Sequence, residues 1–378
     1  MKKEILSIVC ILILALMLLT LTGCGNSTNN STGNSNNGDA EVTKVGNLSL
    51  ELQQINDFSE GLAAAKKDGK WGYIDKAGNV VIDFIYEKAD NFSEGLASVK
   101  KDDKAGFINT KGETVVDFIY RSTYAFSNGY GVIREGIYYG AVDKEGNVVI
   151  EPTKYYNVSS LSEDLFMVDG DKGYDIINKS GEIIVDGTAG MGKLSDGLIP
   201  VKQLYVNGKT DMQNGKWGFL DKSGNIVIDY QYDYVGSFVN GLAGVVKDGK
   251  IGYINTKGEY VIEAQYPYED NTILRDYSCG IVRVYDGEKS IYFDESGNQV
   301  FTLENSTIGD FSEDMTWVIN DEDDKRGYVN TKGKIVIDYK YTRASSFSDG
   351  LAKVYTDDES FEFINSKGKT ILAGKIVK

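Results

Sequence analysis

The chain has 378 residues, 41% of them hydrophobic, a net charge of −16 and no histidine. The missing histidine excludes Ser-His-Asp and Cys-His catalysis, histidine zinc sites and histidine haem ligation. The acidity argues against nucleic acid as a partner and against direct adhesion to anionic lipid, because both require basic patches.

The first 23 residues are predicted to be a signal peptide. Lys2 and Lys3 precede an almost wholly apolar run at 5–21, which ends in Leu21-Thr22-Gly23-Cys24. A basic start, an apolar stretch and small residues before the cut describe a secretory signal. A run of about 18 apolar residues also has the length of a membrane anchor, but the last four residues resemble the bacterial lipoprotein signal. This resemblance implies that Cys24 becomes lipidated, and more than one acyl chain makes such anchoring stable.

Residues 24–44 are predicted to be the lipidated cysteine and a flexible tether. Positions 25–39 contain only Gly, Asn, Ser, Thr and Asp, which lack the apolar groups that offset the entropy of ordering. The leader holds two lysines and one glutamate, so the rest of the chain carries −17. We attribute this acidity to solubility.

Residues 45–378 are predicted to be one repeat domain of nine copies. The same glycine returns at intervals of 34 to 43 residues, each time three positions after an Asp or Asn. A period in this range indicates a repeat architecture. The glycines are Gly78, Gly112, Gly146, Gly181, Gly224, Gly258, Gly297, Gly333 and Gly368.

The copy at 58–91 predicts four short strands, at 62–66, 71–75, 79–83 and 86–89. Asp68-Gly69 is the dipeptide most favoured in tight hairpins, because both residues accept positive φ. Asp75 and Gly78 fit a type I turn, which the Asp side chain caps and the glycine ends in the left-handed region.

Two recurring motifs carry a family resemblance. Lys70-Trp71-Gly72-Tyr73-Ile74-Asp75 and its counterpart at 216–221, with the corner Phe58-Ser59-Glu60-Gly61, resemble bacterial WG β-repeats over about residues 55–375. The Trp is kept in two copies, and its Gly is replaced by Asp175, Ile291 and Glu362. The resemblance implies an exported or modular protein and no shared chemistry.

Short antiparallel strands in every copy predict an all-β fold. The repeats form either a β-propeller, with one blade per copy, or an open β-hairpin solenoid. Nine copies exceed the usual four to eight blades. A closed ring is nevertheless favoured. The last copy stops after its third strand, and residues 47–55, which precede the first corner, could supply its missing strand.

Catalytic, cofactor and metal residues are not predicted, and Cys24 is the one site residue, for lipidation. Cys279 would need a neighbouring base to act as a nucleophile, so we expect a small packed side chain. Acids after the third strand are expected to face water, although paired carboxylates would suit a glycosidase. These acids are Asp83, Asp117, Glu151, Asp229, Glu263 and Asp338.

Six tyrosines share one repeat position, and we expect them to pack between repeats. If they faced outward instead, they would form an aromatic row suited to binding sugars or peptides. They are Tyr86, Tyr120, Tyr155, Tyr232, Tyr266 and Tyr341.

The function predicted is that of a monomeric, non-enzymatic lipoprotein on the outer side of a bacterial membrane. Its repeat scaffold would bind an unknown envelope protein or polysaccharide, through residues that differ between copies, especially 187–216 and 264–290. A carbohydrate-acting hydrolase with paired carboxylates and a purely structural envelope spacer are the alternatives.

Overall fold

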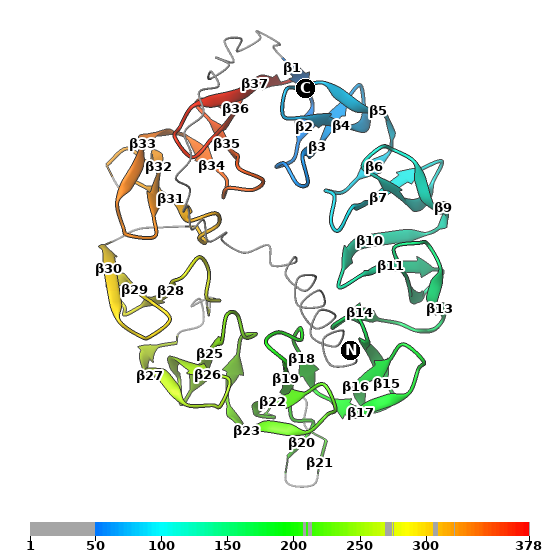
Figure 1. Cartoon of the computed structure of the whole chain (residues 1–378), viewed down its shortest axis with the longest axis vertical. Helices are drawn as coiled ribbons and strands as arrows, with labels where there is room; N and C mark the ends of the chain where they lie inside the picture. Colours follow the sequence, from blue (N-terminus) through cyan, green and yellow to red (C-terminus); the bar gives the residue numbers. More distant parts are fainter. Residues whose placement is uncertain are drawn as a thin grey trace, which may run out of the picture.

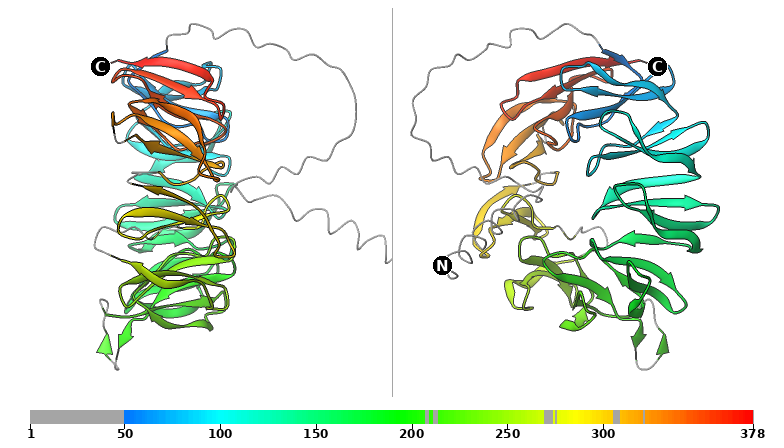
Figure 2. Two further views of the ribbon diagram at one scale, coloured as in Figure 1. Left: turned by 90° about the vertical axis from the view of Figure 1, so that its left-hand side faces the viewer. Right: turned by 45° about the vertical axis from the view of Figure 1, so that its right-hand side comes forward.

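The computed structural model describes residues 50–206, 209–210, 214–268, 274, 276–304, 309–320 and 322–377. In these residues the regular secondary structure is all β, and nine small sheets stand side by side as the blades of a closed propeller (Figure 1). Edge on, the ring is a flat disc (Figure 2). The propeller is therefore correct and the open solenoid is wrong.

The predicted signal peptide, Cys24 and the tether up to position 44 lie outside the described residues. Within the described part of the chain, no helix is long and apolar enough to cross a membrane.

Each complete blade contains four antiparallel strands that run in chain order from the centre of the ring outward. Blades 1 to 3 contain β2 (Gln54–Ile55), β3 (Leu62–Lys67), β4 (Lys70–Asp75), β5 (Val80–Tyr86), β6 (Lys88–Ala89), β7 (Leu96–Lys101), β8 (Lys104–Asn109), β9 (Thr114–Tyr120), β10 (Ser122–Ser127), β11 (Tyr130–Glu135), β12 (Tyr138–Val142) and β13 (Val148–Tyr155). Blades 4 to 6 contain β14 (Val158–Ser160), β15 (Leu165–Gly170), β16 (Gly173–Asn178), β17 (Ile183–Thr188), β18 (Gly190–Met191), β19 (Leu198–Lys202), β22 (Trp217–Asp221), β23 (Ile226–Tyr232), β24 (Tyr234–Val235), β25 (Leu242–Lys247), β26 (Lys250–Asn255) and β27 (Tyr260–Pro267).

Blades 7 and 8 show three strands each in the residues described, and blade 9 has four of its own. The strands are β28 (Val282–Tyr285), β29 (Lys289–Phe293), β30 (Gln299–Glu304), β31 (Met315–Ile319), β32 (Arg326–Asn330), β33 (Ile335–Tyr341), β34 (Arg343–Ala344), β35 (Ala352–Tyr355), β36 (Ser360–Ile364) and β37 (Thr370–Ile376). The hairpin β20 (Tyr205–Val206) and β21 (Lys209–Thr210) is inserted in blade 5 and projects beyond the rim (Figure 1).

The N-terminal segment closes the ring, as predicted, but in a different way. Strand β1 (Leu50–Leu52) pairs in parallel with β37 and becomes a fifth, outermost strand of blade 9. The next residues, β2, form the innermost strand of blade 1. The short fourth strand predicted at 86–89 therefore opens the next blade, and the last blade lacks none of its own four strands.

The hydrophobic core lies between neighbouring blades. One cluster joins Tyr73 and Ile82 of blade 1 to Phe92 and Val99 of blade 2. At the closure, Leu52 packs with Phe361 and Leu372 of blade 9. Each blade thus buries its two faces against its neighbours, which explains why one repeat alone cannot hide its apolar side chains.

The glycine of the Trp-Gly motif is required by a bulge in the outermost strand. Trp71 pairs with Tyr86 but Tyr73 pairs with Ile82, so three residues of β5 face Gly72 alone. A β-carbon on Gly72 would lie 2.6 Å from the carbonyl oxygen of Ile82. The same close contact with the neighbouring strand is found at Gly106, Gly140, Gly218, Gly252 and Gly327.

Candidate functional site

The most repeated polar residues line the inner ends of the blades and join one blade to the next. In the first corner, Glu60 and Gly61 have φ values of 54° and 85°, the two positive values of a tight hairpin turn. Ser59 Oγ donates to the carbonyl oxygen of Phe92 at 2.8 Å, and Glu60 accepts the Gly95 N–H at 2.9 Å. The corner motif is therefore a contact between blades.

The same two contacts cross the closure between blades 9 and 1. Ser348 Oγ donates to the carbonyl oxygen of Phe58 at 2.8 Å, and Asp349 accepts the Gly61 N–H at 2.6 Å. Lys76 adds an ion pair with Asp349 at 3.1 Å. The corner acids are thus engaged in holding the ring together.

Cys279 occupies this acid position in blade 7, and its Sγ accepts the Asp314 N–H at 3.4 Å. The side chain is half-buried, so it takes the place of a corner acid between blades 7 and 8.

The six acids predicted after the third strand lie within the outermost strands instead. Asp83, for example, is one of the three bulged residues opposite Gly72. All six are exposed and each lies on a different blade. These acids therefore lie on the rim of the ring, each in its own bulge.

The six tyrosines that share a repeat position pack inward, as predicted. Tyr86, Tyr120, Tyr232 and Tyr341 are buried in the clusters between blades. Tyr155 and Tyr266 are half-buried against the neighbouring blades. This repeat position belongs to the core.

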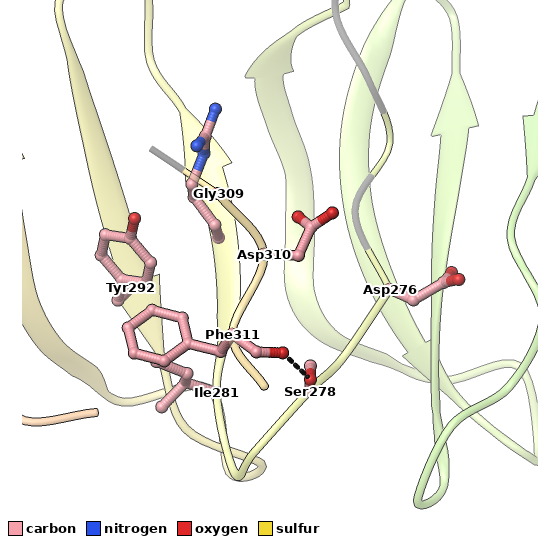
Figure 3. Close-up of a pocket in the computed structure, with 8 residues that line it drawn as sticks. Asp276, Ser278, Ile281, Tyr292, Gly309, Asp310 and Phe311 are labelled. Carbon is pink, nitrogen blue, oxygen red and sulfur yellow. Dashed lines mark hydrogen bonds between the residues drawn. The ribbon is translucent and has the colours of Figure 1, made fainter. Parts of the chain in front are cut away.

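A small pocket lies where blades 7 and 8 meet (Figure 3). Its volume is about 300 Å³, including space open to solvent. Asp276 and Asp310 both line it, but their carboxyl groups point in different directions (Figure 3). Burial, and then the charge of Asp310, raise the pKa of Asp276. The other lining residues are Ser278, Ile281, Arg283, Tyr292, Gly309 and Phe311.

This pocket brings together two carboxyl groups that the sequence did not single out. Only about 20 Å³ of this space is enclosed, which is room for about one water molecule and far less than a ligand pocket. The hydrolase with paired carboxylates stays a prediction. The described residues contain no group of three or more His, Cys, Asp and Glu side chains that could hold a metal ion.

Blade 3 exposes tyrosines that are absent from the repeat pattern. Tyr124 of β10 stacks on Tyr139 of β12 with ring centres 6.0 Å apart. The guanidinium of Arg134 lies 5.2 Å from the centre of the Tyr139 ring, and its Nε is buried with no hydrogen-bond partner. We call these three side chains, with the pair Tyr138 and Tyr156, the tyrosine cluster.

The second pair of the tyrosine cluster lies at the same end of the blade. The rings of Tyr138 and Tyr156 are 5.3 Å apart. Tyr156 is 59% exposed, Tyr124 is 43% exposed, and Ile137 in the adjacent turn is 55% exposed. Hydrogen bonding to Tyr139 raises the pKa of Tyr124, and hydrogen bonding to Tyr138 raises that of Tyr156. The hydroxyls therefore stay protonated at neutral pH, with their hydrogens engaged inside the two pairs and their oxygens able to accept.

Basic side chains gather beside the tyrosine cluster. We call the turns at 66–70, 100–104 and 134–135 and the links at 87–88 and 121 the basic hairpin face of blades 1–3. It holds nine Lys and Arg against five Asp and Glu. Links and turns are in contact, because the Arg121 N–H donates to the carbonyl oxygen of Arg134 at 2.9 Å.

The opposite ends of the same blades are acidic. The corners and turns at 57–60, 75–76, 90–94, 111–113 and 143–145 hold eight acids and three lysines. In blades 1–3 one face of the ring is therefore basic and the other acidic. The negative net charge of the whole chain does not indicate this difference.

The tyrosine cluster was missed because its members occupy different repeat positions. The available signal was the doublets Tyr138-Tyr139, four residues after Arg134, and Tyr155-Tyr156, directly after Lys154. Recognition was predicted instead at 187–216, where the structure shows the β20–β21 insertion, and at 264–290, which lies partly outside the described residues. Those two assignments stay predictions.

The model of the WG containing repeat family matches residues 48–71, 71–104, 106–136, 139–169, 217–250, 251–289 and 327–359, together more than half of the chain. The stretches outside these matches include Asp175, Ile291 and Glu362, the residues that replace the glycine opposite the bulge. The bulge is absent opposite Ile291 and Glu362, whereas opposite Asp175 a shorter bulge of two residues is kept.

A solved structure described as the eukaryotic initiation factor aligns with a TM-score of 0.56 and 14% identity, over 82% of this chain and 94% of the other. BamB from Moraxella catarrhalis aligns with a TM-score of 0.39 and 12% identity, over 72% of this chain and 89% of the other. Apo AztD from Citrobacter koseri aligns with a TM-score of 0.41 and 12% identity, over 85% of this chain and 94% of the other. The initiation factor shares the fold alone. No curated protein matches in sequence.

Proposed function

This chain belongs to the WG-containing repeat family, and from its closed ring and the lipoprotein-like sequence that ends in Cys24 we propose that it is a lipoprotein presenting a propeller as a binding scaffold. Cys24 would carry the lipid and hold the protein on the outer side of a bacterial membrane. The tether at 25–44 would let the disc turn freely above the bilayer.

One observation carries the binding role. The polar residues that recur between copies are used within the ring, since corner serines and acids bond to the next blade and the turn Asp and Asn side chains cap their own turns. Exposed side chains that differ between blades, such as those of the tyrosine cluster, remain available to a partner. A repeated scaffold with a surface that differs between copies is the arrangement of repeat proteins that bind.

Labelling with an alkyne analogue of palmitate tests the anchor. The wild-type protein should take up the label and fractionate with membranes, because acyl chains on Cys24 partition into the bilayer. Cys24→Ser should lose both properties, and the control Cys279→Ser should keep them. Label on the Cys24→Ser chain, or an unlabelled wild type, would show that the anchor assignment is wrong.

Affinity capture from an envelope extract tests the scaffold role. The detergent-solubilised protein should retain an envelope component that an unrelated lipidated protein does not retain. Recovery of nothing above that control, at both low and high salt, would favour the structural spacer.

A further inference from the structure

We propose that the basic hairpin face of blades 1–3 binds an acidic polysaccharide, with its anionic groups on the lysines and its sugar rings against Tyr124 and Tyr156. This inference rests on the binding role proposed above and names the class of ligand. Three properties of the surface carry it: unpaired positive charge, exposed aromatic rings and limited extent.

The positive charge is not neutralised within the ring. Of the five acids on the basic hairpin face, Glu87 and Asp103 lie 3.9 and 3.0 Å from Lys100, and Glu135 lies 3.9 Å from Lys104. In the part of the chain that the structure describes, the exposed cations Lys67, Lys70, Lys88 and Lys101 form no ion pair. In an acidic molecule, such a group favours an anionic partner.

The aromatic rings make the surface suitable for sugars rather than for charge alone. Tyr124 and Tyr156 combine a partly exposed ring with a hydroxyl oxygen, so each offers an apolar face and a hydrogen-bond acceptor for a sugar hydroxyl. Arg134 lies beside the Tyr139 ring, which places a fixed cation next to this aromatic surface. A pyranose carrying a carboxylate matches this combination of apolar face, hydroxyls and negative charge.

The extent of the surface distinguishes a polymer from a membrane. The turns at the same end of blades 7–9, residues 286–289, 322–326 and 357–359, hold eight acids and three basic residues. A flat anionic bilayer lying against the whole disc would meet these acids, whereas a polysaccharide chain can follow blades 1–3 alone. The geometry therefore points to a glycan.

Calorimetry on the full lipidated protein in detergent tests the proposal, with polygalacturonate as the acidic glycan. Dextran serves as a neutral glycan and poly-glutamate as an anionic polymer without sugar. Polygalacturonate should bind most tightly and lose affinity as salt rises. Equal binding of dextran would overturn the role of charge in the proposal. Equal binding of poly-glutamate would overturn the role of the sugar.

Two variants locate the site. Tyr124→Ala/Tyr156→Ala and Lys67→Glu/Lys101→Glu should each weaken polygalacturonate binding about tenfold or more. The matched controls are Tyr285→Ala, an equally exposed tyrosine on blade 7, and Lys111→Glu, an exposed lysine on the acidic face. Controls that weaken binding as much as the variants would place the glycan elsewhere; unchanged thermal midpoints show that all four chains fold.

Binding to lipid vesicles tests whether the basic hairpin face binds an anionic membrane instead of a glycan. Vesicles of phosphatidylglycerol and of phosphatidylcholine should take up the lipidated protein equally, because its acyl chains insert into both. A preference for phosphatidylglycerol that Lys67→Glu/Lys101→Glu abolishes, without glycan binding, would show that the face binds membranes instead. Failure here leaves the palmitate labelling of Cys24 unaffected, so the two proposals fail separately.

Discussion

The turn that ends at the repeated glycine depends on two residues in every copy. Asp75 Oδ1 accepts the N–H groups of Ala77 and Asn79 at 2.9 and 2.8 Å, and Gly78 has a φ of 84°. Asn109 makes the same two contacts at 3.0 Å in the next copy. Asn can replace Asp in these two contacts because an amide oxygen accepts as a carboxylate oxygen does. Only Asp titrates, and only Asp has a second oxygen that accepts from the Asn side chain four residues later, as Asp75 Oδ2 does from Asn79 at 2.9 Å.

Acid should therefore weaken the Asp turns and not the Asn turns. Hydrogen bonds from Asn225 lower the pKa of Asp221, and those from Asn298 lower that of Asp294. A lowered folded pKa contributes stability above the unfolded value of about 3.9, and this stability is lost as the pH falls through the folded value. We expect Asp221→Asn/Asp294→Asn to be less stable than the wild type at pH 7, because the new amide cannot accept the Nδ2–H groups of Asn225 and Asn298. The variant should lose less stability than the wild type between pH 5 and 3.

Urea unfolding at several pH values checks this expectation. The control is Asp229→Asn, which changes an exposed acid outside the turns. An equally steep acid loss in the turn variant and the wild type would contradict the argument.

Among the elements, the bulged outermost strand has two consequences. It fixes a glycine opposite the bulge, and it places an exposed acid on the edge strand, at Asp83 in blade 1. Bulges and charges on an edge hinder pairing with another chain. Apolar residues such as Val80 and Ile85 are exposed on the same strand, so the acids have a physical role without catalysis.

Replacing the glycine should destabilise a bulged blade. Gly72→Ala puts a methyl group against the backbone of Ile82 and Asp83, and overpacking of this kind costs about 2 kcal/mol. Glu362→Ala is the control, because Glu362 pairs regularly with Ala373 and no bulge faces it. The free energy of unfolding in urea measures both, and equal losses would contradict the role of the bulge.

At the scale of the whole molecule, stability depends on the closure between blades 9 and 1. Strand β1, the Leu52 side chain and the contacts of Ser348 and Asp349 all meet there.

Leu52→Ala should destabilise the ring by about 3 kcal/mol, since large-to-small changes in a core leave a cavity. Small-angle scattering at intermediate urea should then show an expanded ring, because an opened closure exposes the faces of blades 1 and 9. Ile371→Ala, an exposed change on the adjacent strand β37, is the control. A cooperative loss of the whole ring without expansion would argue against opening at the closure.

The repeat pattern was enough to predict the blades and the N-terminal closing segment. Turn residues act locally, so Asp75, Gly78 and the dipeptide Asp68-Gly69 determine where strands end within each copy. The assignment of the short strand at Lys88–Ala89 to the next blade was not predictable, because strand pairing across a blade boundary depends on contacts between repeats.

The sequence by itself thus determined the all-β repeat, its turns and its buried tyrosine position, because these follow from periodic local chemistry. Only the tertiary structure decided that nine copies close into a ring, that β1 adds in parallel, and that lysines from separate turns gather beside the tyrosine cluster. Net charge and spacing along the chain carry no record of which face a side chain reaches. That placement follows from the packing of each blade against the next.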